Sequence, residues 1–87
     1  MSAQAQYEAK QLVSLARNIS SSAKFVQHDL LILIENTAQI KDVAPDLTEF
    51  TDPALTELQR ARGLIAESLE IANNLYQTGL DTLKGGE

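Results

Sequence analysis

The first half of the chain carries an aliphatic residue at every seventh position. The members of this repeat are Leu12, Ile19, Val26, Leu33 and Ile40. Further apolar residues lie between them, namely Leu15, Ala16, Ala23, Leu30 and Val43. A repeat of seven keeps one side of an α-helix against a neighbouring helix. The pattern therefore predicts a helix that packs along a second helix through this line of residues.

Residues from about 3 to 43 are predicted to form this one long helix. The segment contains neither proline nor glycine, and Ser2 is placed to cap its start. Three serines, Ser20–Ser22, offer an alternative because serine side chains can cap a new helix. Since the seven-residue repeat stays in phase across the serines, we favour a continuous helix. The alternative is a kink near Ser20–Ser22, with residues 3–18 folding back as the third helix of a bundle.

A turn is predicted over residues 44–52. Pro45 disfavours helical angles at Ala44, so the first helix should end near Val43. Asp46 and Glu49 have the spacing of a capping box, which could hold one turn of helix within this connection.

The second helix is predicted from about 53 to 83. Asp52 followed by Pro53 is a typical helix start, with an acid at the N-cap and proline in the first helical position. Gly85 and Gly86 should end the helix and leave residues 84–87 as a frayed tail.

The second helix carries its own stripe with steps of three and four residues. Its members are Leu55, Leu58, Arg62, Ile65, Leu69, Ala72, Tyr76, Leu80 and Leu83. The stripe fits an antiparallel partner in which Val43 faces Leu55 and Leu15 faces Leu83. Residues before Leu15 would then have no partner on the second helix. The predicted fold is an all-α protein with a single helical domain, 1–87, built as a long antiparallel helical hairpin.

Three residues of the second helix depart from the expected pattern. Arg62 lies within the apolar stripe, where it would either specify the register or extend its charge out of the seam. Gly63 and Gly79 each cost roughly 1 kcal/mol relative to alanine inside a helix. Close approach of another helix would explain them, most of all Gly63 beside Leu64 and Ile65, and a tolerated exposed glycine is the alternative.

Apolar residues also lie outside the predicted seam of both helices. Because a two-helix hairpin has one seam only, such residues predict burial against further helices. The hairpin is therefore expected to pack into an oligomeric helical bundle. The candidate protein-interface residues are Phe25, Leu31, Ile32, Ile34, Ala38, Leu64, Ile71 and Leu75.

The charges on the first helix indicate where such a contact lies. Lys10, Arg17 and Lys24 repeat every seven residues, and the next two positions of this register are Leu31 and Ala38. The polar face thus becomes apolar towards the turn. We expect Leu31, Ala38 and the nearby Ile34 to meet another subunit, although the fold-back of residues 3–18 would cover similar surface.

Composition argues against several kinds of chemistry. The 87 residues include no cysteine and one histidine, so no thiolate or multi-histidine metal site is expected. His28 and Asp29 are adjacent, and neighbours on a helix point in different directions. Twelve acids against seven bases give a net charge of −5, which disfavours nucleic acid as a partner. We expect no enzyme activity, no cofactor, no metal and no small-molecule substrate.

No membrane span is expected from the sequence. The longest apolar run, Leu30–Ile34, is far shorter than the roughly 20 residues that a spanning helix needs. The first six residues have neither the basic nor the apolar segment of a secretory signal. The expected location is cytoplasmic, and export by a route without a cleavable signal stays open.

One short segment resembles a known family. Residues Thr51-Asp52-Pro53-Ala54-Leu55-Thr56-Glu57-Leu58-Gln59 resemble the turn and second-helix start of type III secretion needle subunits. The resemblance implies a helical hairpin that polymerises. This chain departs from the family in its longer predicted turn and in its glycine-rich end, where needle subunits have an apolar terminus. Small hairpin chaperones of the same secretion systems are similar in architecture.

The sequence favours a non-enzymatic structural or interaction protein. In this interpretation the chain is a hairpin subunit that assembles through coiled-coil-like packing with itself or with a partner protein. The alternatives are a small helical chaperone or adaptor that binds a partner's amphipathic helix, and a needle-like or filament-like secretion-system subunit.

Overall fold

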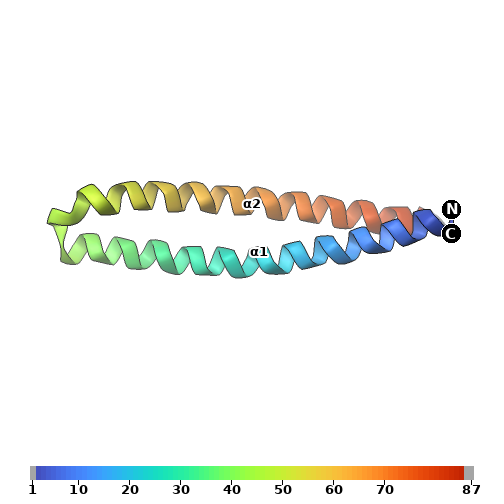
Figure 1. Cartoon of the computed structure of the whole chain (residues 1–87), viewed down its shortest axis with the longest axis horizontal. Coiled ribbons are helices and arrows are strands. Elements are labelled where there is room, and N and C mark those ends of the chain that lie inside the picture. Colours follow the sequence, from blue (N-terminus) through green and yellow to red (C-terminus); the bar gives the residue numbers. More distant parts are fainter. Residues whose placement is uncertain (1, 86–87) are drawn as a thin grey trace. The chain divides into compact units, whose positions relative to one another are not determined.

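The computed structural model describes residues 2–85, which form an all-α helical hairpin. Its elements are α1 (Ala3–Val43), the short 3₁₀-helix η1 (Pro45–Leu47) and α2 (Thr48–Gly85). The chain reverses direction at η1, so that α2 runs antiparallel to α1 (Figure 1). The predicted all-α helical hairpin is confirmed.

The first helix has the bounds that the sequence predicts. The Ser2 hydroxyl oxygen accepts a hydrogen bond of 3.1 Å from the Ala5 backbone N–H and so caps the helix start. Helix α1 passes through Ser20–Ser22 without interruption. Residues 3–18 belong to this helix and do not fold back as a third one.

The turn is shorter than predicted. The Ala44 N–H donates to the Ile40 carbonyl oxygen (2.8 Å), and the Leu47 N–H donates to the Ala44 carbonyl oxygen (3.0 Å). Pro45 takes the first position of η1, a place where its missing N–H costs nothing.

The predicted start of the second helix at residue 53 is therefore wrong. Helix α2 begins at Thr48, directly after η1, and Pro53 lies inside it. Either proline could mark a helix start. Pro45 begins η1, which leads directly into α2, whereas Pro53 lies within α2. The segment that resembles needle subunits consequently lies within α2 and not at a turn. Of the predicted tail, Lys84 and Gly85 belong to α2, and residues 86 and 87 lie outside the described residues.

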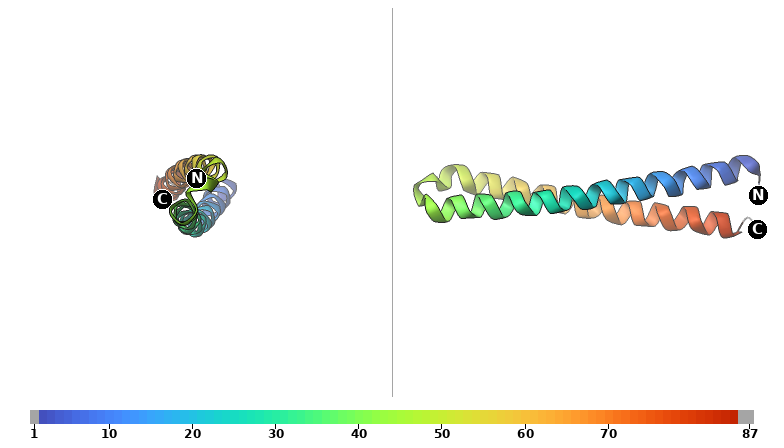
Figure 2. Two further views of the ribbon diagram at one scale, coloured as in Figure 1. Left: turned by 90° about the vertical axis from the view of Figure 1, so that its left-hand side faces the viewer. Right: turned by 90° about the horizontal axis from the view of Figure 1, so that it is seen from below.

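The chain divides into two units, and each is described by itself. The end unit comprises the described parts of Met1–Lys24 and Glu67–Glu87, and the turn unit is Phe25–Ala66. Within the turn unit, the segments of α1 and α2 lie side by side in both long views (Figures 1 and 2).

The core of the end unit consists of small residues. Ala16 and Ala72 are each 1% exposed, and Ala9 and Ala23 are also buried. A Cβ atom added to Gly79 would lie 2.6 Å from Val13 Cγ2 and 3.2 Å from the Ala9 carbonyl oxygen. The backbones of the two helices thus approach each other closely here, which only small side chains permit.

Two larger side chains of the end unit, Arg17 and Tyr76, contact each other across the two helices. The Arg17 guanidinium lies 5.7 Å from the centroid of the Tyr76 ring, and Arg17 Nη2 donates to the Tyr76 hydroxyl oxygen at 3.5 Å. A guanidinium over an aromatic face adds a cation–π attraction.

The seam of the turn unit is more polar. Leu30 and Thr51 are its buried residues, and the Thr51 hydroxyl donates to the Leu47 carbonyl oxygen at 3.4 Å. Lys41 Nζ forms an ion pair of 2.8 Å with Asp52 Oδ1. The half-buried positions between the helices include both polar and apolar residues, namely Gln27, Ile34, Thr37, Ala38, Thr48, Leu55, Leu58, Ala61 and Ile65.

The predicted seam of the first helix is confirmed in part. Ala16, Ala23 and Leu30 are buried as predicted, Leu12 is half-buried, and Ala9 continues their line towards the helix start. Ile19, Val26, Leu33 and Ile40 are exposed, as are Leu15 and Val43. Small side chains bring the two helices closer than leucine and isoleucine would allow, and the bulky residues project from the hairpin.

The predicted stripe of the second helix is confirmed at all positions but one. Arg62 is exposed, and the half-buried Ala61 takes its place in the seam. Gly79 is buried as an additional member. The other predicted positions are buried or half-buried, namely Leu55, Leu58, Ile65, Leu69, Ala72, Tyr76, Leu80 and Leu83.

The predicted pairing of the helices is also wrong. Lys41 meets Asp52 in the turn unit, whereas Val43 opposite Leu55 would have placed it near residue 57. In the end unit Val13 meets Gly79, so residues before Leu15 do have partners on α2. The shift follows from the shorter turn, because the length of the connection sets the register of an antiparallel pair.

Candidate interaction site

The predicted interface residues divide into two groups. Ile34 and Ala38 are half-buried and lie at seam positions within the turn unit. The remaining six are exposed: Phe25, Leu31, Ile32, Leu64, Ile71 and Leu75. A contact patch composed of Leu31, Ile34 and Ala38 would therefore include two side chains that already pack within the hairpin.

In the turn unit, α1 exposes several large apolar side chains. Phe25 and Ile32 lie seven residues apart, and Phe25 is 75% exposed. Leu31 is exposed as well. Contiguous exposed apolar surface of this kind marks an interaction site in most proteins.

A separate line of exposed aliphatic residues follows α1 through the turn unit. We call Val26, Leu33, Ile40 and Val43 the turn stripe. Val26, Leu33 and Ile40 are 43–51% exposed, and Val43 is 85% exposed. Because the spacing is again seven residues, with Val43 three residues after Ile40, these side chains lie along one side of α1.

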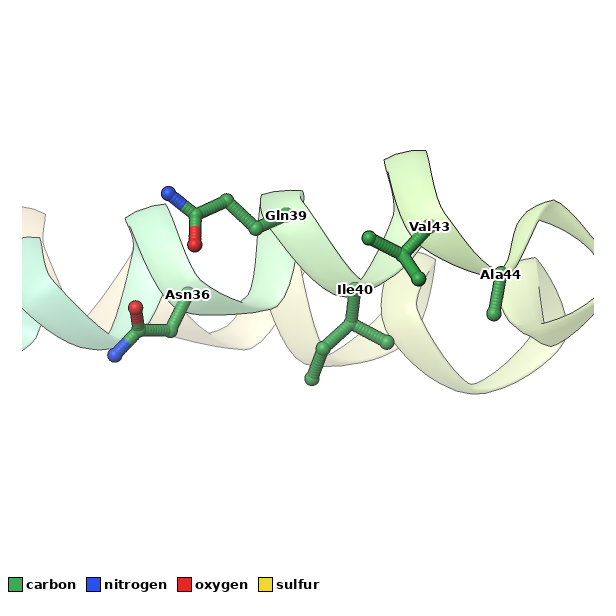
Figure 3. Close-up of a pocket in the computed structure, with 5 residues that line it drawn as sticks. All are labelled: Asn36, Gln39, Ile40, Val43 and Ala44. Atoms are coloured by element: carbon green, nitrogen blue, oxygen red, sulfur yellow. The ribbon is translucent and has the colours of Figure 1, made fainter.

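The turn stripe ends at an open hollow. This hollow has a volume of about 400 Å³ and is lined by Asn36, Gln39, Ile40, Val43 and Ala44. Figure 3 shows the side chains of Ile40 and Ala44 projecting to the same side of α1, with the amides of Asn36 and Gln39 towards one end. Its lining of aliphatic carbons with two amides suits an apolar side chain from another helix.

The end unit has a corresponding but smaller feature. We call Leu12, Leu15 and Ile19 the end stripe, in which Leu15 and Ile19 are exposed and Leu12 is half-buried. A hollow of about 220 Å³ lies beside it, lined by Ala5, Glu8, Ala9, Leu12 and Thr82.

The charges of α1 differ in sign between the two units. Residues 3–24 carry one acid and three bases, a net charge of +2. Residues 25–43 carry three acids and one base, a net charge of −2, and the one base, Lys41, is paired with Asp52. Of the predicted basic stripe, Lys10 and Lys24 are exposed, and Arg17 contacts Tyr76.

Features of other functional classes were sought over the same residues. Among residues 2–85, no three side chains of the His, Cys, Asp and Glu types gather as metal ligands. His28 and Asp29 are both exposed. None of the helices described is long and apolar enough to cross a membrane.

Sequence reasoning placed two groups of residues in one seam, and the structure separates them. Ala16, Ala23 and Leu30 are buried, whereas Ile19, Val26, Leu33 and Ile40, which have the same spacing, are exposed. The seam position that sequence reasoning missed is Ala9, and the signal for it was its spacing of seven from Ala16. Comparison of the chain with protein-family models, curated proteins and solved structures finds no match.

Proposed function

We propose that this chain is a non-enzymatic structural subunit, a helical hairpin that assembles with copies of itself through coiled-coil-like packing. The observation that carries the proposal is the set of large apolar side chains left exposed on α1 of the turn unit. They include Phe25, Ile32 and the turn stripe. Their burial against further helices would stabilise an assembly by roughly 1.5–3 kcal/mol for each fully buried side chain.

A chaperone or adaptor is the second candidate. The hollow at Asn36–Ala44 favours it, because an amphipathic helix of another protein could place one apolar side chain there. The two candidates differ in their behaviour without other proteins. A self-assembling subunit associates when pure, and an adaptor stays a monomer until its partner is added.

Light scattering coupled to gel filtration distinguishes these outcomes. Over a concentration series, the pure chain should grow beyond its monomer mass of 9.5 kDa. Exchange of Phe25 and Ile32 for glutamate should weaken association at least about 30-fold, because about 2 kcal/mol or more of burial is lost. The matched control exchanges Gln59 and Asn73, two exposed polar residues of α2, for glutamate.

Each outcome of the light-scattering experiment favours one of the two candidates. A monomer at every concentration would contradict self-assembly and favour the adaptor. Equal weakening by the control would assign the effect to charge rather than to lost apolar contact. Circular dichroism of each variant verifies that both helices are retained.

A further inference from the structure

We infer that the turn unit pairs with the turn unit of a second copy of this chain, with both units pointing the same way and α1 of each packed on α2 of the other. Phe50 of each copy then enters the hollow at Asn36–Ala44 of the other copy. The inference rests on the proposed self-association and adds its surface, its partner and its orientation.

The first argument is that one face of the turn unit is apolar. Five large exposed side chains each directly precede a residue that lies between the two helices. One residue advances a helix by about 100°, and an antiparallel helix pair has an approximate two-fold axis perpendicular to its plane. Residues with the same offset from the seam therefore lie on the same face of the pair, whichever helix they belong to. We call them the apolar face, which consists of Val26, Leu33 and Ile40 on α1 and Phe50 and Leu64 on α2.

The opposite face of the turn unit is mostly polar. The seam positions that the apolar face precedes are Gln27, Ile34, Lys41, Thr51 and Ile65, and the residues that directly follow them are His28, Glu35, Asp42, Asp52 and Ala66. None of these five is a large apolar residue, although Leu31, which follows the buried Leu30, is exposed on this side. A hairpin with one apolar face has one surface to bury, and a second copy that uses the same face closes a dimer around a two-fold axis.

The second argument is a protruding side chain and a hollow at the same height. Phe50 is 66% exposed. The ion pair between Lys41 and Asp52 sets the register of the two helices, and counting from it places Phe50 level with Val43, which lines the hollow of about 400 Å³ (Figure 3). The lining of this hollow also includes the aliphatic side chain of Ile40.

This shared height favours two turn units that point the same way. A two-fold axis parallel to the helices lays α2 of one copy on α1 of the other and leaves every height unchanged. Phe50 of each copy then meets the hollow of the other, and the contact is made twice. Turn units that pointed in opposite directions would carry Phe50 towards the far end of the other unit, away from the hollow.

The third argument concerns the polar residues of the same face. Asp29 and Asn36 directly precede seam residues of α1, and Glu57 and Arg60 directly precede seam residues of α2. In the inferred pairing Asn36 lies level with Glu57 of the second copy, so its amide can donate to that carboxylate. Asp29 lies about 6 Å along the axis from Arg60 of the second copy. Packing α1 on α1 would instead oppose Asp29 with an acidic helix segment, so complementary charge favours α1 on α2.

Disulfide trapping tests the pairing, because the chain contains no cysteine. Asn36→Cys and Glu57→Cys are prepared as separate variants and mixed under mild oxidation. The mixture should form the mixed disulfide at least about tenfold more than either variant alone forms its own, because the bond needs Cα atoms within about 7 Å. The matched control mixes Asn36→Cys with Gln59→Cys, whose position follows Leu58 and so lies on the opposite face.

Sedimentation equilibrium tests the role of Phe50. Phe50→Ala should weaken association at least about tenfold, because its burial is lost in both hollows of the dimer. Leu31→Ala, which removes an exposed apolar side chain of the opposite face, should change association by less than about twofold. Circular dichroism verifies that both variants retain their helices.

The outcomes separate this inference from the proposed function. Association with no more mixed disulfide than in the control would overturn the inference, while the proposed self-assembly survives. A strong disulfide in Asn36→Cys alone would place α1 against α1 and overturn it as well. Association of Phe50→Ala as tight as that of the unaltered chain would have the same meaning. A monomer at every concentration would overturn both proposals.

Discussion

The end unit and the turn unit use the same two helices in different ways. In the end unit, Ala16, Ala72 and Gly79 bring the backbones together, so the seam is completed within one chain. In the turn unit, the seam includes Gln27, Thr37 and Thr51, and many large aliphatic side chains are exposed. Among the described residues, the turn unit exposes ten large hydrophobic side chains and the end unit five.

This contrast separates stability from assembly. A close-packed seam of small residues excludes water and gains dispersion contacts along its whole length. The seam of the turn unit contains Gln27, Thr37 and Thr51 among its apolar residues, and so it is less uniformly apolar. We therefore expect the end unit to hold the hairpin together and the turn unit to depend on a partner for its stability.

The largest expected effect is the loss of association on changing the turn stripe. Replacement of Leu33 and Ile40 by glutamine should weaken association at least about 30-fold, since each side chain is about half exposed and about 1 kcal/mol of burial is lost for each. Sedimentation equilibrium measures the change. The paired control replaces Gln11 and Asn18, exposed polar residues of the same helix, by serine, and it should change association little. An unaltered dissociation constant in the first variant would assign no role to the turn stripe.

The next largest expected effect is a loss of stability when a buried alanine of the end-unit seam is enlarged. Ala16→Leu should lower the free energy of unfolding by about 1–3 kcal/mol, because a fully buried site has no room for three further carbon atoms. Ala54→Leu, at an exposed position of the turn unit, should change it by less than about 0.5 kcal/mol. Urea denaturation compares the two. Equal effects would mean that the end unit is not close-packed.

The two glycines of α2 should respond with opposite signs. Gly63→Ala should raise the free energy of unfolding by about 0.5–1 kcal/mol, because nothing lies within 4 Å of the added Cβ and alanine favours the helix. Gly79→Ala should lower it by about 1 kcal/mol, because the Cβ meets the stiff Val13 side chain and the Ala9 carbonyl oxygen. Thermal unfolding gives both values. A stabilising Gly79→Ala would contradict the close approach of the helices.

The smallest effects concern the polar pair of each unit. Lys41→Gln should cost at most about 1 kcal/mol, and the cost should shrink at high salt, because both Lys41 and Asp52 are about half exposed. Arg17→Gln should cost about 0.5–1 kcal/mol with less dependence on salt, because its partner is the Tyr76 ring. Unfolding at two ionic strengths tests the difference. The same salt dependence at both sites would remove this distinction between the units.

Much of the fold was predictable from local patterns. The bounds of α1 follow from Ser2, the absence of proline and glycine, and Pro45. The stripe of α2 is correct except at Arg62, because steps of three and four residues identify a helix face regardless of its partner. Each of these features is determined by the residues of a single helix, so it can be predicted without knowing how the two helices pack.

The errors concern relations between helices. Pro45 and Pro53 are equivalent as start signals, and the choice between them depends on the whole turn. That choice sets the register and thereby the pairing of Lys41 with Asp52. The predicted seam of α1 included both large and small residues, and the structure buries Ala16, Ala23 and Leu30 and exposes Ile19, Val26, Leu33 and Ile40. Of the predicted interface residues, Phe25 and Ile32 are exposed, whereas Ile34 and Ala38 lie at the intramolecular seam.

Amide hydrogen exchange at two protein concentrations tests the central claim most directly. If the turn unit needs a second copy, amides of residues 25–43 and 48–66 should exchange several-fold more slowly at the higher concentration, because association stabilises the state that buries them. Amides of residues 5–24 and 67–84 should exchange at nearly the same rate at both concentrations. Equal and high protection of both units in dilute protein would contradict the account, because a single chain would then suffice to fold the turn unit.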